Sequence, residues 1–177
     1  MKSTLIIMCG PQACGKSTLA KWIEDSHEDC ILVSRDKIRF ALLGEGDDYF
    51  AKENLVLRQY FHNINAGLQN HKYVIADATH ISRKSRNQLF SNVNTKSVRV
   101  VGVWVEVPMH VAIKQNEQRT GRARVPEEVI RRAFRTKFTP QNDERFDEMI
   151  YVNPQEGLGL GNVSTGLTSI REKLETI

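Results

Sequence analysis

One segment near the start of the sequence carries glycine, lysine and serine at a spacing suited to binding phosphate. Residues 10–17 read GPQACGKS and match the pattern G-x-x-x-x-G-K-[ST] in full. The two glycines let backbone N–H groups turn toward phosphate oxygens. Lys16 can place its charge between the β- and γ-phosphates, and Ser17 can offer its hydroxyl to Mg²⁺. The candidate ATP-binding residues of this phosphate loop are Gly10, Pro11, Gln12, Ala13, Cys14, Gly15, Lys16, Ser17 and Thr18. For the Cys14 side chain we expect a spacer role.

A carboxylate and a cation stand together in the segment SRDKIR, residues 34–39. Arg39 follows Asp36 by three residues, so both lie on one face of a helix. Asp36 can receive the proton of an acceptor hydroxyl, and Arg39 can bind a phosphate beside that hydroxyl. An exposed helix N-terminus, where the helix dipole favours Asp, explains the same pattern equally well.

A third group follows the apolar run that ends at Ala76. Asp77 stands where phosphate-loop proteins commonly place an aspartate that holds the magnesium shell, in part through water. Asp77 and Thr79 are therefore candidate substrate-binding residues, and Asp77 is also a candidate metal residue. For His80 we expect a solvent-exposed or supporting position and no catalytic role.

Several arginines follow a predicted helix in the segment 115–124, QNEQRTGRAR. Arginines on a short helix–loop–helix suit a lid, at about residues 112–126, that closes over ATP and neutralises the transferring group. Arg119 and Arg122 are the candidate ATP-binding residues of this lid. An ordinary surface helix is the alternative, but Thr-Gly and the following Val-Pro favour a mobile loop. Between Lys114 and Lys137 eight Lys/Arg face three Glu, a balance of +5.

The secondary structure that positions these groups can be predicted from the hydrophobic pattern, which alternates between strand and helix spacing. This alternation predicts a three-layer α/β/α domain with a parallel five-stranded sheet, in the order 2-3-1-4-5, and a helical lid. Ser34 and Ser82 are suited to cap helices, and Pro108 and Pro126 to open them. The predicted strands are 4–9, 30–33, 73–76, 98–105 and 149–152; the predicted helices include 16–25 and 49–70.

Residues 1–154 are expected to form the phosphate-loop domain, with the lid at about 112–126, and residues 155–177 a glycine-containing linker and a C-terminal helix. That helix can dock on the domain or make a dimer contact, and the sequence leaves both open.

The 177 residues suit one domain. The apolar run Leu5–Cys9 is too short to cross a bilayer, and no signal peptide or membrane partner is expected. Three cysteines without a metal-binding spacing favour the cytosol.

Four blocks together resemble the polynucleotide 5′-hydroxyl kinase branch of the P-loop kinases, a group often placed with the AAA-family ATPases. They are GPQACGKST, SRDKIR, VIADATHISRKSR, and NEQRTGRARVPEEVI with the later PQNDERFDEMIYV, in family order from Leu5 to Val152. The resemblance implies ATP and Mg²⁺ as cofactors and Lys16, Asp36 and Arg119 as catalytic residues.

The resemblance also assigns the acceptor side of the reaction. Asp36 would be the general base for a DNA or RNA 5′-hydroxyl, and Arg39 would grip the neighbouring phosphate. The sequence departs from the family at Gln115, where an arginine is usual, and Arg122 or Arg124 could replace it. The alternatives are a kinase for a small hydroxyl compound, such as a nucleoside, sugar, antibiotic or aminoacyl group, and an ATP-dependent switch without an acceptor. Net charge of +4 and a pI near 9.0 permit an anionic partner.

Overall fold

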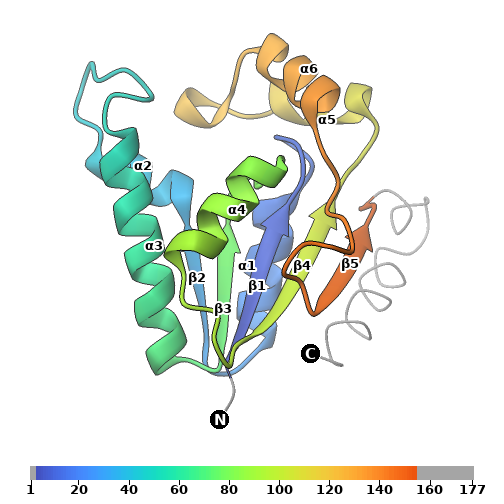
Figure 1. Ribbon diagram of the computed structural model, residues 1–177. Coiled ribbons are helices and arrows are strands. Elements are labelled where there is room, and N and C mark those ends of the chain that lie inside the picture. Colours follow the sequence, from blue (N-terminus) through green and yellow to red (C-terminus); the bar gives the residue numbers. More distant parts are fainter. Residues whose placement is uncertain (1–2, 155–177) are drawn as a thin grey trace.

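Five short apolar runs pair side by side in one parallel sheet (Figure 1). The computed structural model describes residues 3–154, and the predicted linker and C-terminal helix lie outside the described residues. The strands follow the order β2-β3-β1-β4-β5, which confirms the predicted order. Their bounds are β1 Thr4–Cys9, β2 Cys30–Ser34, β3 Tyr73–Asp77, β4 Arg99–Val105 and β5 Glu148–Val152.

The register of the strands decides which side chains meet at the carboxyl edge of the sheet. Ser34 of β2 pairs with Asp77 of β3, and Asp77 pairs with Met8 of β1. The phosphate loop follows β1 directly, so its start lies beside the ends of β2 and β3. Ligands of open α/β sheets bind at this edge.

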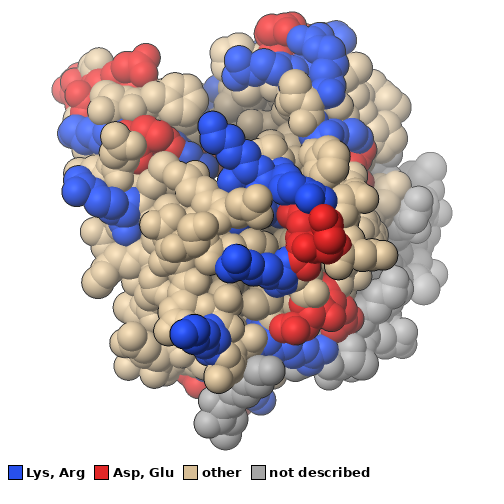
Figure 2. All heavy atoms as spheres, viewed as in Figure 1, with Lys and Arg blue, Asp and Glu red and all other residues tan. Residues whose placement is uncertain are grey.

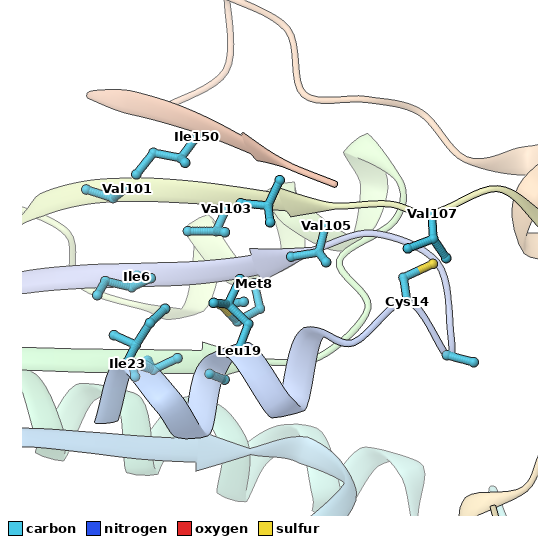
Figure 3. Packing of buried hydrophobic residues seen from close by; sticks show 14 of the residues in the cluster. Ile6, Met8, Cys14, Leu19, Ile23, Val101, Val103, Val105, Val107 and Ile150 are labelled. Carbon is cyan, nitrogen blue, oxygen red and sulfur yellow. The ribbon is translucent and has the colours of Figure 1, made fainter. Parts of the chain in front are cut away.

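Helices cover both faces of the sheet, which confirms the three-layer α/β/α architecture (Figure 1). Alternate residues of β1 serve the two cores, because side chains of a strand point to opposite faces. Ile6 and Met8 lie in the cluster with Leu19 and Ile23 of α1 (Figure 3). Leu5 and Ile7 lie in the cluster with buried residues of α3 and α4. The helices are α1 Lys16–Ser26, α2 Arg35–Leu42, α3 Glu53–Asn70, α4 Arg83–Asn92, α5 Met109–Glu117 and α6 Glu127–Thr136.

The helix α3 begins at Glu53, four residues later than predicted. Asp48 accepts a hydrogen bond from the backbone N–H of Phe50 through its side chain at 2.9 Å. Such a local turn competes with helix formation. The predicted start at Tyr49 is therefore wrong, and residues 43–52 form a loop between α2 and α3, here called the α2–α3 loop.

Residues 109–136, with α5 and α6 over the carboxyl edge, contain the lid predicted at about 112–126. This whole segment is called the lid below, and its two ends lie close together. Pro108 and Pro126 stand at the N-caps of α5 and α6, as predicted. Between these helices lies the short 3-10 helix Gly121–Ala123. Glu106, just after β4, forms an ion pair with Lys137, just after α6. This ion pair joins the points where the lid leaves and re-enters the domain.

The outer edge of the sheet at β2 is partly covered by a side chain. The backbone N–H of Leu32 donates to the Glu24 carboxylate of α1 at 3.0 Å.

Within residues 3–154, no helix combines the length and the apolar character needed to cross a membrane.

Candidate active site

The phosphate loop adopts a backbone that its glycines make possible. Gly10 has a φ of 129°, and a Cβ atom there would lie 2.1 Å from the carbonyl oxygen of Val105. Gly15 has a φ of 90° and stands at the N-cap of α1 without a side-chain cap. The first N–H groups of α1 are therefore available to an anion, which the helix N-terminus also favours. Ala13, at a φ of 60°, continues the tight curl of the loop.

Lys16 lies in this loop with its side chain folded inward. It is buried, and its Nζ donates to the carbonyl oxygen of Pro11. Burial lowers the pKa of Lys16, and the positive charge of Arg119 lowers it further, while nearby Asp77 opposes the shift. Both the lid arginine and the aspartate thus lie close enough to Lys16 to influence its charge.

The hydroxyls of Ser17 and Thr18 are on exposed residues at the start of α1, whereas the neighbouring thiol is not accessible. Cys14 is buried, and its Sγ donates to the carbonyl oxygen of Gln12 at 3.6 Å. Burial raises the pKa of this thiol, which therefore stays protonated at neutral pH. This environment fits the spacer role expected for Cys14.

Asp77 lies at the end of β3, buried between the phosphate loop and β2. Burial raises the pKa of its carboxyl, while a hydrogen bond with Ser17 and the charge of Lys16 lower it in part. The structure thus brings Ser17, Lys16 and Asp77 together. Thr79 joins them through its backbone, because its carbonyl oxygen accepts from the N–H of Gly10 at 2.8 Å.

Asp36 lies in the first turn of α2, and its side chain is 64% exposed. Ser34 caps this helix, accepting a bond from the N–H of Lys37. The Asp36 carboxylate accepts hydrogen bonds from Arg39 Nη1 and from the Tyr49 hydroxyl, each at 2.9 Å. Its charge contributes to the raised pKa of Asp77. Both carboxylates therefore belong to one site.

Arg39 is only 2% exposed, a position that the sequence did not suggest. Its guanidinium donates to Asp36, to the Tyr49 hydroxyl at 3.2 Å and to Glu53. It also lies over the ring of Tyr49, with Cζ 4.4 Å from the ring centroid. Arg35 donates to the other oxygen of Glu53. Tyr49 and Glu53 lie 10 and 14 residues beyond Arg39, and no local spacing pattern marks them.

The lid arginines reach different places. Arg119 donates to the carbonyl oxygen of Ala123 within the lid at 3.4 Å. Arg122 instead donates across to the carbonyl oxygen of Gly44, in the α2–α3 loop, at 3.1 Å. Arg124 is exposed, and Gln115 is half-buried. Figure 2 shows mainly Lys and Arg side chains on the lid, with some Asp and Glu at its top, and Asp and Glu side chains on the α2–α3 loop.

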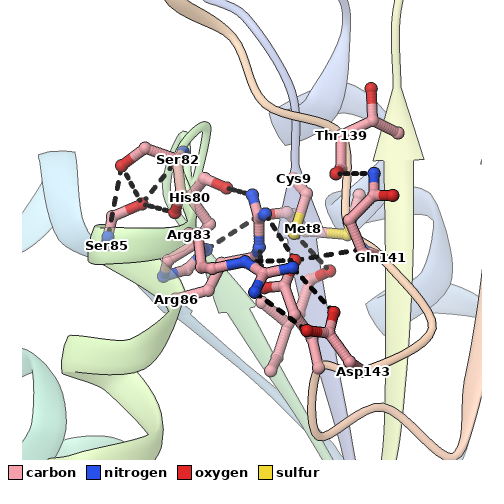
Figure 4. A network of polar contacts seen from close by, with 12 residues as sticks. Met8, Cys9, His80, Ser82, Arg83, Ser85, Arg86, Thr139, Gln141 and Asp143 are labelled. Atoms are coloured by element: carbon pink, nitrogen blue, oxygen red, sulfur yellow. Dashed lines mark hydrogen bonds and ion pairs between the residues drawn. The ribbon is translucent and has the colours of Figure 1, made fainter.

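His80 is buried, so the expectation of a solvent-exposed side chain is wrong and the supporting position is the one observed. Its Nδ1 lies 2.8 Å from the carbonyl oxygen of Met8, an acceptor, and must therefore carry the proton. Its Nε2 lies 3.4 Å from the hydroxyl of Tyr60. Burial lowers the pKa of His80 to about 4, so the ring is neutral at pH 7. Around it, the polar contacts in Figure 4 join β1, α4 and the segment after α6.

Comparison with known proteins places this site in a family. The sequence profile of the AAA domain matches residues 5–140, which is most of the chain. The chain belongs to the AAA domain family. No curated protein sequence matches this AAA domain significantly.

Solved structures show where the same fold recurs. A chain of the Pnkp1/Rnl/Hen1 RNA repair complex is 23% identical, with a TM-score of 0.65, and the match covers 74% of this chain and 42% of that chain. This AAA domain thus spans about two fifths of that relative. Chaetomium thermophilum Kti12 in complex with ADP-AlF3 is 14% identical, with a TM-score of 0.66 and 97% of both chains covered. A gluconokinase from Sinorhizobium meliloti 1021 is 17% identical, with a TM-score of 0.55 and coverage of 99% and 97%.

At these identities the likeness establishes the fold. The AAA domain described here has the fold of the P-loop kinase-like, ATP-dependent phosphotransferases. The predicted resemblance to P-loop kinases is confirmed at this level. Relatives that act in RNA repair and on small molecules share the fold, so the fold leaves the acceptor unassigned.

Proposed function

We propose that this protein transfers the γ-phosphoryl group of ATP to a 5′-hydroxyl end of DNA or RNA. The observation that carries the proposal is the position of Asp36. Its exposed carboxylate stands at the same sheet edge as the phosphate loop, and an arginine and a tyrosine hold it in place. A fixed carboxylate beside a nucleotide site suits a kinase of hydroxyl groups.

The phosphate loop fits ATP and Mg²⁺ in the chemistry of its donors. Backbone N–H groups of residues 12–18, which include the N-terminus of α1, would hold the phosphates, and Lys16 would leave the carbonyl oxygen of Pro11 to contact them. Ser17 would hold Mg²⁺, with Asp77 acting through a bound water. When bound, the metal supplies charge that neutralises the phosphates.

The chain's own residues would then orient the acceptor and neutralise charge. Asp36 orients the hydroxyl and accepts its proton, which leaves late because the transition state is loose. Arg119 neutralises the transferring group from the lid. Arg39 binds the phosphate next to the hydroxyl, and Thr79 helps to line the acceptor side.

A nucleic acid acceptor is supported by two observations. The segment from Lys114 to Lys137, nearly all of which lies in the lid, has a balance of +5, which suits a polyanion. One relative of the same fold is part of an RNA repair complex. The proposal includes a kinase domain of residues 1–154 and a cytosolic location, where thiols such as those of the three free cysteines stay reduced.

A small hydroxyl compound is the second candidate, and one observation favours it. Arg39 is buried and already paired with Glu53, so a phosphate must displace or share these contacts. A small acceptor without a phosphate needs no such exchange. The gluconokinase with the same fold is consistent with this candidate.

Transfer of labelled phosphate from γ-³²P-ATP tests the proposal directly. The acceptors are 5′-OH DNA, 5′-OH RNA, a nucleoside panel and gluconate. Lys16→Ala should abolish transfer, whereas Lys21→Ala, an exposed lysine of the same helix, should leave it unchanged. Label on the nucleosides or gluconate alone would support the second candidate. ATP hydrolysis without any labelled acceptor would indicate a switch.

A further inference from the structure

The α2–α3 loop brings a tyrosine to the candidate base, outside the motifs that define the site. Tyr49 lies 13 residues beyond Asp36, and its hydroxyl donates to Asp36 Oδ1 at 2.9 Å. The same hydroxyl accepts from Arg39 Nη1 at 3.2 Å. Because a tyrosine hydroxyl has one proton, these two bonds fix its orientation.

The two oxygens of Asp36 stand in different surroundings. Oδ1 accepts from both Arg39 and Tyr49, each at 2.9 Å. Oδ2 accepts no hydrogen bond from any residue within 3–154, and 64% of the Asp36 side chain is exposed, so this oxygen is accessible. A carboxylate held by one oxygen has its other oxygen free for a substrate proton.

The ring of Tyr49 is also in contact with neighbouring side chains. Arg39 Cζ lies 4.4 Å from its centroid, a cation–π distance. The rings of Phe40 and Phe50 meet it edge to face at 6.3 and 4.9 Å. Burial, with the nearby charge of Asp36, raises the pKa of Tyr49 to about 12, so the phenol remains a donor at neutral pH.

We propose that Tyr49 is a positioning residue, which with Arg39 anchors Asp36 Oδ1 and so presents Oδ2 to the acceptor hydroxyl. The inference rests on the proposed function, since it assumes that Asp36 is the base. It extends the acceptor site from α2 into the α2–α3 loop. The role belongs to the hydroxyl group of Tyr49, because the ring alone can keep the contact with Arg39.

A double-mutant cycle tests this role. Tyr49→Phe keeps the ring and removes the hydroxyl, and Tyr49→Ala removes both. Tyr49→Phe should lower kcat for transfer by about 10- to 100-fold, the range expected for a hydrogen bond to a charged group, with the KM for ATP unchanged. In an Asp36→Asn background Tyr49→Phe should cause little further loss, since residues that act as a unit are not additive. Tyr151→Phe, at an exposed position of β5, is the matched control and should keep the wild-type kcat.

The outcomes separate the two proposals. If the wild type labels an acceptor and Tyr49→Phe retains full kcat, the positioning role is overturned and the kinase assignment stands. An equal fold loss in the wild-type and Asp36→Asn backgrounds overturns it too, because the loss would then not pass through Asp36. If the wild type labels no acceptor, the proposed function fails, and the inference fails with it. Thermal melting of each variant, together with its KM for ATP, checks that the fold is intact. Tyr49→Ala, which removes the ring as well as the hydroxyl, should lower kcat at least as much as Tyr49→Phe.

Discussion

Arg86, fully buried in α4, donates two hydrogen bonds to Glu144, which lies 58 residues further along the chain. Nε lies 2.6 Å from Oε2, and Nη2 lies 2.8 Å from Oε1. The third nitrogen, Nη1, donates to the carbonyl oxygen of His80 at 2.9 Å (Figure 4). The pair therefore fastens the segment after α6 to the turn that follows β3, beside the candidate site.

Arg86→Met should lower the free energy of unfolding by about 3–5 kcal/mol, because it removes both close hydrogen bonds of the Arg86 guanidinium to the buried Glu144 carboxylate, which keeps only a longer ion pair with Arg83, at 3.9 Å, and one backbone N–H. Urea denaturation measures the loss. The comparison variant is Arg83→Met, since Arg83 pairs closely with the exposed Asp143, at 2.7 Å, and only distantly with Glu144, at 3.9 Å, so the loss should be much smaller. Equal losses for the two variants would contradict a stabilising buried pair.

His80 should make the protein less stable as the pH falls from about 6.5 to about 4. In the folded state the ring stays neutral down to a pKa of about 4, whereas the unfolded chain takes up the proton near 6.5. The unfolded state thus binds more protons in this window, and stability should fall by up to about 3 kcal/mol across it.

His80→Asn removes this titration and suits the positive φ of 38° at this position. The variant should be less stable at pH 7, and the gap to the wild type should narrow toward pH 4. Urea denaturation at a series of pH values measures that gap, in which the effects of other groups cancel. A gap that stays constant would show that His80 does not cause the acid sensitivity.

Gly10→Ala should destroy ATP binding, because its Cβ would stand 2.1 Å from the backbone oxygen of Val105. The loop would have to shift away from the sheet. Gly46→Ala is the matched control: Gly46 also has a positive φ, of 80°, but no atom of residues 3–154 lies within 4 Å of the place its Cβ would take. Titration with a fluorescent ATP analogue should show loss of binding for the first variant alone. Loss in neither would mean that the loop tolerates the clash.

Gln115→Arg should raise the transfer rate by about 5- to 100-fold, since a second lid cation at the transition state is worth ~1–3 kcal/mol. Steady-state kcat checks this against Gln118→Arg, which adds the same charge at an exposed position nearby. An unchanged rate for Gln115→Arg would indicate that Arg122 or Arg124 already provides the second lid cation. Arg122 now contacts Gly44, so it would first have to leave that contact.

Asp36→Asn should cut transfer by roughly 10²–10⁴ and leave ATP binding nearly intact. Arg39→Ala should weaken binding most for acceptors that carry a phosphate beside the 5′ nucleoside, because a guanidinium binds phosphate in bidentate fashion. The KM values for a 5′-OH oligonucleotide, a nucleoside 3′-monophosphate and the nucleoside separate these effects. Lys37→Ala, exposed on the same helix, is the control. An equal loss for all three acceptors would instead make Arg39 a support for Asp36.

The fold and the phosphate loop could be predicted because their information is local. An apolar run followed by G-x-x-x-x-G-K-S marks the strand, loop and helix together, and Ser82 caps α4 in a capping box with Ser85. The surroundings of Arg39 could not be predicted, since Glu53 reaches it across a loop of irregular conformation. The burial of His80 likewise depends on Tyr60 and the carbonyl of Met8, which lie 20 and 72 residues away.

The start of α3 likewise could not be predicted from hydrophobic spacing. Hydrophobic spacing alone extends the helix back to Tyr49. The side chain of Asp48 instead forms a turn with Phe50, so the helix begins at Glu53. That shift of four residues frees Tyr49 to reach Asp36. Tyr49 and Glu53, which hold Asp36 and Arg39, therefore come from or adjoin the least regular segment of the described chain, where periodicity carries the least information.

The ion pair between Glu106 and Lys137 has a consequence for how such enzymes diversify. It joins the two points where the lid leaves and re-enters the domain, so residues 109–136 are a segment with adjacent ends. A segment of this kind can be exchanged with little disturbance to the sheet, since its ends need not move. Lids of other lengths could be grafted between Glu106 and Lys137, which would let one phosphate-loop core serve acceptors of very different size.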